Sequence, residues 1–309
     1  MTPYRLDPAA RARVQVACNV VNEEIGQQRQ NIVFVAIGIA IVAIPLFAAY
    51  PDQRRNIAYA ALFAILGMVG YARRQVAQTY KRLVVGRVVK ALGNGLTYRP
   101  ESSFDAKRFR ALDVFADNAT SFTSEDEIGG RKANVSYSIH EVRATRRQGK
   151  QTVTVFHGLM IRLDFNKNFR GQTTVVPNGV SPAGHSLLGG LLDIGGSPRK
   201  EKVNLENPDF ENIFDVYSTN DQEARYLLTP KLMELVLAAN AANSDGQLRL
   251  SFLDNSLYVA VPSRGNHLEA SLSETVTPDS AIGDLAEVIA FAERLVDELQ
   301  LETRLWSRA

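Results

Sequence analysis

Two long apolar stretches without charged side chains lie close together near the start of the chain. They cover residues 31–50 and 57–72, and the six residues between them begin with Pro51. An α-helix rises about 1.5 Å per residue, so the first stretch can cross a hydrocarbon core of about 30 Å. The second is shorter, but flanking arginines can extend along the acyl chains to the headgroups. Because neither stretch has a polar face, the pattern favours an antiparallel transmembrane hairpin over a buried pair of helices in a soluble protein.

Amphipathic helices are predicted on both sides of this hairpin. Residues 1–30 carry an apolar stripe at helical spacing, and residues 73–95 carry a second stripe beside basic side chains. The second helix could lie on the inner leaflet with its cations among the lipid headgroups, or it could pack on the first helix as a stalk. The stalk is favoured, because two amphipathic helices on the same side of a hairpin are natural partners. The candidate headgroup contacts are Arg73, Arg74, Lys81, Arg82, Arg87 and Lys90.

From residue 96 onward the apolar period changes from helical spacing to two, which is typical of strands. Residues 96–178 are predicted to form an antiparallel meander, and residues 179–204 a loop rich in Gly, Ser and Pro. Residues 205–309 contain a strand, two helices, a hairpin and a long amphipathic C-terminal helix. The fold class expected is α+β with a mainly antiparallel sheet. The pattern leaves open whether 96–178 and 205–309 form one domain or two.

The charge of the chain changes at the same place as its periodicity. The first 92 residues have a net charge of +8 and the remainder −6, although the whole chain is only +2. Ten Lys or Arg residues flank the hairpin and only Arg54 and Arg55 lie in its turn, which predicts that both termini and the large domain are cytoplasmic. An acidic soluble part argues against binding to nucleic acid.

Several segments of the chain together resemble a known bacterial family. They are 124–130, the strand that ends at His140-Glu141-Val142, 164–169 and, above all, 214–230. The chain resembles the membrane-protein family known as domain of unknown function 3137, and the resemblance extends over almost the whole chain. It departs from the family pattern at His140, where a serine would be expected. The resemblance implies a bacterial inner-membrane protein of this architecture and implies no activity.

No motif in the sequence assigns a reaction. The histidines form no zinc-binding pair, and there is no nucleophile elbow, phosphate-binding loop or dinucleotide fingerprint. Cys18 is the only cysteine, which excludes an internal disulfide and a cysteine-based zinc site. The acidic triplet Glu125-Asp126-Glu127 is more typical of a solvated turn than of a metal site. We therefore expect no catalytic residue, no cofactor and no metal.

These patterns favour a membrane-anchored cytoplasmic interaction or scaffold module, integral through two helices, that binds a protein partner or a second copy of itself. The first alternative is an enzyme at the membrane surface that acts on a lipid or an envelope precursor, with Arg225, Asp164 and Glu141 converging in a cleft. The second alternative is an accessory transport subunit. The absence of charge inside both apolar stretches disfavours it.

Arg225 has two interpretations. On an exposed helix it would pair with Asp221, four residues before it, for only about 0.2–0.5 kcal/mol. Half-buried, it would instead act as a structural clamp by binding the carboxylate of Asp164 on the meander. The sequence favours the structural clamp.

Overall fold

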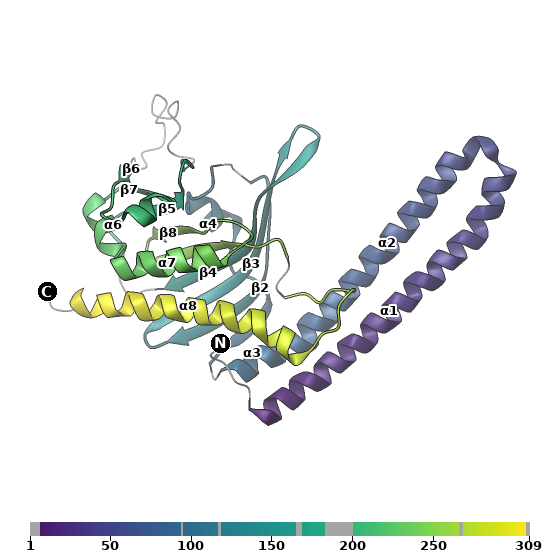
Figure 1. The fold of residues 1–309 in the computed structure, drawn as a ribbon, viewed down its shortest axis with the longest axis horizontal. Helices are drawn as coiled ribbons and strands as arrows, with labels where there is room; N and C mark the ends of the chain where they lie inside the picture. Colours follow the sequence, from purple (N-terminus) through teal and green to yellow (C-terminus); the bar gives the residue numbers. More distant parts are fainter. Residues whose placement is uncertain are drawn as a thin grey trace. The chain divides into compact units, whose positions relative to one another are not determined.

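The computed structural model describes residues 7–93, 95–116, 119–164, 169–182, 200–265 and 268–306. The chain divides into two compact units. A helical unit contains residues 1–94 and 267–286, and a sheet unit contains residues 95–266 and 287–309. The α+β fold class expected from the sequence is confirmed, with long helices followed by a large antiparallel sheet (Figure 1).

The helical unit is built on an antiparallel pair of long helices (Figure 1, purple and blue). Helix α1 (Pro8–Ala49) is continuous, so residues 8–30 and 31–49 belong to one helix and not to two elements. A 3-10 turn, η1 (Pro51–Gln53), leads into α2 (Arg54–Tyr80), which continues through one π-helical turn, η2 (Lys81–Val85), into α3 (Gly86–Leu92). The predicted boundary near residue 73 is also absent, because no helix-breaking residue separates the apolar stretch from the amphipathic one.

The part of the pair nearest the chain's N-terminus has a buried seam between the helices, and we call residues 8–30 and 72–92 the stalk. The predicted apolar stripes supply this seam, and α1 contacts both η2 and α3. Its buried side chains include Val14, Ala17, Val21 and Ile25 on one helix and Val76, Tyr80, Val84 and Val88 on the other. In this unit residues 72–92 therefore pack on residues 8–30 of α1.

A segment far away in the sequence also packs on the stalk. Asn22 donates to the carbonyl oxygen of Val276 and accepts from the Val276 N–H, both at 2.8 Å. Arg29 donates to the carbonyl oxygen of Leu272 at 2.6 Å, and Lys81 lies 3.4 Å from Glu269. Residues 268–286, which we call the strap, have no clear apolar period before the last helix begins, so the sequence did not predict this contact.

Within the residues that the structure describes, the sheet unit contains one nine-stranded antiparallel sheet with the order β1-β2-β3-β4-β9-β8-β5-β7-β6. The strands are β1 (Thr97–Glu101), β2 (Ser121–Lys132), β3 (Val135–Gln148), β4 (Gln151–Asp164), β5 (Thr173–Pro177), β6 (Glu201–Val203), β7 (Phe214–Ser218), β8 (Arg249–Leu253) and β9 (Ser256–Pro262). The helices are α4 (Ala106–Ala111), α5 (Pro208–Glu211), α6 (Asp221–Leu227), α7 (Pro230–Ala242) and α8 (Pro278–Trp306). Residues of α8 up to Ala286 belong to the helical unit and the later ones to the sheet unit.

The predicted meander is only partly right. Strands β2, β3 and β4 do follow one another, but β9 and β8 lie between β4 and β5. Residues 96–178 and 205–309 therefore share one sheet. The short helix α4 also interrupts the segment that the alternation had indicated as strand, because Asp105 caps it by accepting the Arg108 N–H at 2.7 Å.

The pairing of β4 with β9 does not extend to the start of β4. The last pair is Gly158 with Pro262, so residues 151–157 of β4 have no β9 partner. Gly158 has φ +150°, and a Cβ atom there would overlap the carbonyl oxygen of Val261. Only glycine allows the two backbones to approach this closely while the strands diverge.

We predict that Gly158→Ala destabilises the full-length protein by at least about 3 kcal/mol, through backbone strain and overlap with Val261. Gly149→Ala is the matched control, because Gly149 also has positive φ (+61°) but has open space where a Cβ would lie. It should cost only about 1 kcal/mol. Urea unfolding in a mild detergent measures both, and equal losses would contradict the close-approach argument.

Candidate anion-binding pocket

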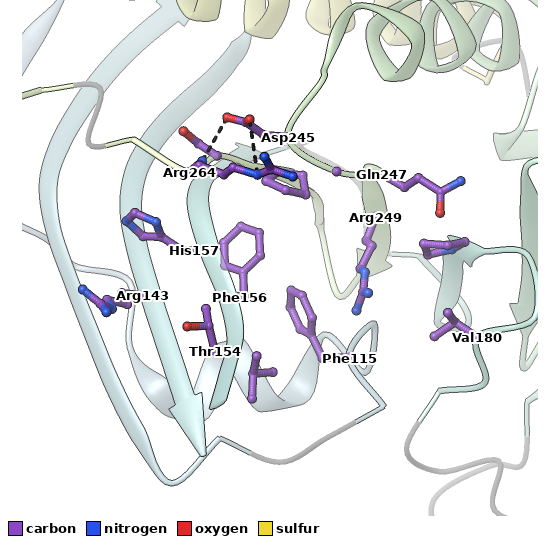
Figure 2. Close-up of a pocket in the computed structure, with 15 residues that line it drawn as sticks. Phe115, Arg143, Thr154, Phe156, His157, Val180, Asp245, Gln247, Arg249 and Arg264 are labelled. Atoms are coloured by element: carbon purple, nitrogen blue, oxygen red, sulfur yellow. Dashed lines mark hydrogen bonds and ion pairs between the residues drawn. The ribbon is translucent and has the colours of Figure 1, made fainter. Parts of the chain in front are cut away.

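A cavity of about 660 Å³ lies beside the part of β4 that extends beyond β9 (Figure 2). Its walls come from β3, β4 and β8, from the ends of β5 and β9, and from the segments around residues 115 and 245. Gly246, with φ +156°, lies on the rim, where a Cβ would come within 3.0 Å of Pro262. The cavity therefore forms where the sheet divides. Glycines lie at the two points beside it where the chain approaches β9 most closely.

An aromatic cluster forms the apolar wall of the pocket. Phe115 stacks on Phe109 with ring centroids 4.7 Å apart, and its centroid is 5.2 Å from that of Phe156. Phe115 and Phe156 are buried and belong to the main hydrophobic cluster of the sheet unit. Because the wall is continuous with this core, its side chains are held in place whether or not the pocket is filled.

Arg249 on β8 is the most constrained cation in the pocket. Its guanidinium carbon lies 4.8 Å from the centroid of the Phe115 ring, and Nη1 donates to the carbonyl oxygen of Val114 at 2.9 Å. The side chain is half-buried, and this burial lowers the pKa of Arg249. A guanidinium has five N–H donors, so this single bond leaves donors available for a ligand.

The other charges in the pocket do not balance Arg249. Asp245, the carboxylate of the lining, already lies 3.8 Å from Arg264 and accepts the backbone N–H of Arg264 at 2.9 Å. Arg143 is exposed and is paired across the strands with His157. Among the described residues no carboxylate forms an ion pair with Arg143 or Arg249. The described lining is therefore positively charged.

A second polar cluster surrounds His140, on β3, at the edge of another cavity of about 500 Å³. The Ser102 hydroxyl accepts from the Phe104 N–H and from Ser124, so its own hydrogen points to His140 Nδ1 at 2.8 Å. His140 Nε2 then carries the ring proton and donates to Ser138 at 2.8 Å. This arrangement holds His140 as the neutral tautomer with both ring nitrogens satisfied.

Burial lowers the pKa of His140 to about 4, against the opposing effect of Glu127 3.8 Å away. Burial alone would raise the pKa of Glu127, but hydrogen bonds from Ser103 and Arg99 outweigh it, so the pKa of Glu127 is lowered. His140 is fully enclosed and both of its nitrogens are occupied. The cluster therefore stabilises the sheet and offers no free base to a ligand.

The structure does not bring Arg225 and Asp164 together. Arg225 is exposed on α6 and pairs with Asp221 at 2.9 Å, while Asp164 pairs with Arg162 at 2.7 Å. The expected clamp is therefore not formed, because each group finds a partner close to it in the sequence or on its own strand. Glu141 is buried on β3, and the linings of the two cavities described here include none of Arg225, Asp164 and Glu141.

The candidate headgroup residues differ in exposure. Arg73, Arg74, Arg82, Arg87 and Lys90 are exposed on the helical unit. Lys81 is half-buried beside Glu269 of the strap, so its charge is already compensated. The pocket arginines, Arg143, Arg249 and Arg264, lie on or beside three different strands and were not predicted from the sequence. The one signal for them in the sequence is a cation within the apolar alternation of β8.

Residues 154–301 match the family described as "Protein of unknown function (DUF3137)", which confirms over this stretch the resemblance noted from the sequence. Among proteins with curated descriptions, none matches the chain. Among solved structures, the chain is similar to the mycobacterial trehalose monomycolate transport factor A, with 15% identity and a TM-score of 0.37. That similarity covers 69% of this chain and 95% of the other. A similarity of this size carries no argument about function.

We predict that the protein loses stability as pH falls from about 6.5 to about 4. In this window the unfolded chain protonates His140 while the folded chain keeps it neutral, so acid favours unfolding by up to about 3 kcal/mol. Urea midpoints of the full-length protein in mild detergent, taken between pH 7.5 and 4, measure this slope. His140→Gln should flatten it. If the stability of His140→Gln depended on pH as that of the parent protein does, the pH dependence could not be attributed to His140.

Proposed function

We propose that this protein is a membrane-anchored interaction module, held in the bacterial inner membrane by the α1–α2 hairpin, with a cytoplasmic sheet unit that binds the ligand or partner. One observation supports the proposed membrane anchor. Apart from Val16, Val20 and Tyr226, every exposed large hydrophobic side chain in the described residues lies between Val33 and Tyr71.

A soluble protein does not leave such a long apolar surface in water, because each 100 Å² exposed costs about 2.5 kcal/mol. Both long helices are apolar enough to cross a membrane, by length and composition. Their most apolar windows are 0% and 6% buried, unlike the core helices of a soluble protein. A bilayer around residues 33–71 is the environment that fits this surface.

The proposed orientation rests on the ten Lys and Arg residues that flank the hairpin against two in its turn. Arg73 and Arg74 directly follow the second apolar stretch, at the depth of the headgroups. Lys90 is 16 residues beyond Arg74, about 24 Å farther along the helix axis. Arg73 and Arg74 are therefore the stronger candidates for lipid contact, and Arg82, Arg87 and Lys90 lie along the stalk.

The sheet unit supplies the interaction part of the proposal. Its pocket has fixed aromatic walls and positive charge that the described lining does not compensate. This supports binding more than catalysis, because no general base or nucleophile of the described residues is placed free in it. An accessory transport subunit would be a particular case of such a module.

We predict that Ile41→Lys impairs membrane insertion, because a lysine at the centre of a spanning helix costs about 3 kcal/mol. Val16→Lys is the matched control on the same helix: Val16 is 64% exposed and Ile41 67%, but Val16 lies on the stalk. Resistance of the full-length protein to alkaline carbonate extraction measures insertion. Equal extraction of Ile41→Lys and the parent protein would count against the anchor.

Orientation can be tested by cysteine labelling in a Cys18→Ala background. Asn56→Cys, in the turn of the hairpin, should react with a membrane-impermeant maleimide in spheroplasts with an intact inner membrane. Lys150→Cys, in the exposed β3–β4 turn, should react only after the membrane is opened. The reverse labelling pattern would overturn the cytoplasmic placement of the sheet unit.

A further inference from the structure

The pocket combines a fixed cation with an apolar wall. Arg249 is held in one orientation by the Phe115 ring on one side and by its bond to the Val114 carbonyl oxygen on another. A half-buried guanidinium that is oriented in advance loses little side-chain entropy when it binds a further acceptor. Its remaining donors match the paired oxygens of a carboxylate or a phosphate.

Charge in the described lining favours an anion over a neutral ligand. Asp245 is engaged with Arg264, which leaves Arg143 and Arg249 without a carboxylate partner among the described residues. Removing a cation from water without a counter-charge is unfavourable, and a bound anion relieves this. Burial that lowers the pKa of Arg249 reports the same desolvation.

The apolar wall defines the rest of the ligand. In Figure 2 the rings of Phe115 and Phe156 lie between Arg249 and the neighbouring Arg143 and His157. Val180, which lies on the other side of Arg249 from these rings, adds a further apolar surface. A hydrated inorganic ion would leave these surfaces unused. A volume of about 660 Å³ falls within the range of small-molecule sites, about 300–1,000 Å³.

We propose that this pocket binds a small organic oxyanion, a phosphate monoester or a carboxylate, whose charged end is held by Arg249 and whose aromatic or aliphatic part lies on Phe115 and Phe156. The inference rests on the proposed role of the sheet unit as a binding module and names the class of its ligand. A soluble metabolite and the headgroup of an anionic lipid share this chemistry.

Phenyl phosphate is a suitable probe, with inorganic phosphate and phenol as the controls that lack one half of the chemistry. Titration calorimetry of the full-length protein in zwitterionic detergent should give saturable binding of phenyl phosphate, at least ten-fold tighter than that of inorganic phosphate. Phenol should give none. Equal binding of phenol and phenyl phosphate, or no saturable binding of phenyl phosphate, would overturn the proposal.

Variants test whether the binding takes place in this pocket. Arg249→Gln should weaken phenyl phosphate binding at least ten-fold, and Arg249→Lys should retain part of the affinity. Arg143→Gln should weaken it several-fold and, because Arg143 is exposed, without loss of folding. Arg147→Gln is the matched control, an exposed arginine on the same strand outside the pocket. Parent affinity in folded Arg143→Gln and Arg249→Gln would reject the site, and Arg143→Gln alone decides if Arg249→Gln does not fold.

Competition identifies the source of the oxyanion. Phosphatidylcholine vesicles that contain the reconstituted protein are prepared with and without phosphatidate, and labelled phenyl phosphate is added. Displacement by phosphatidate would support the site with a lipid headgroup as its ligand, and retained binding would support it with a soluble ligand. Carbonate extraction remains the separate test of anchoring: a protein that stays in the membrane but does not bind phenyl phosphate overturns only this inference.

Discussion

The antiparallel pairing of β4 with β9 is the interaction on which the rest of the sheet unit depends. It joins strands β1–β4 to strands β5–β9, and without it the chain would form two small sheets with exposed edges. The pairing ends at Gly158 opposite Pro262, although β4 begins seven residues earlier, at Gln151. Since β3 continues to pair with those residues, the sheet divides there and leaves the cavity between its two parts.

Local features of the fold could be predicted from the sequence, but strand partners could not. Helices α6 and α7 each follow a residue type that favours the N-cap position: Asn220 accepts the Glu223 N–H and Thr229 accepts the Leu232 N–H. These contacts involve residues three apart, so their spacing is visible in the sequence. Alternation shows which residues share a face of a strand and says nothing about the neighbouring strand, which is why β5 was expected beside β4.

The candidate site could not be predicted from the sequence for the same reason. Arg143, Arg249 and Arg264 line one cavity only because β3, β8 and the end of β9 surround the place where the sheet divides. Arg225 shows the opposite error, because a long-range partner was expected where Asp221, one helical turn away, was enough. For an exposed arginine the nearby carboxylate requires the least ordering of side chains.

Helix α1 combines two kinds of surface in one continuous element. Its first part presents a narrow stripe, Val14, Ala17, Val21 and Ile25, which the partner helix and the strap cover. Its second part is apolar on all sides, and its large side chains are exposed. The backbone hydrogen bonds are the same throughout, so the change from stripe to uniform apolar surface comes from side chains alone. In a bilayer that surface needs no protein partner, whereas the stalk needs one in water. This is why Asn22 and Arg29, which hold the strap, lie on the stalk and not in the apolar part.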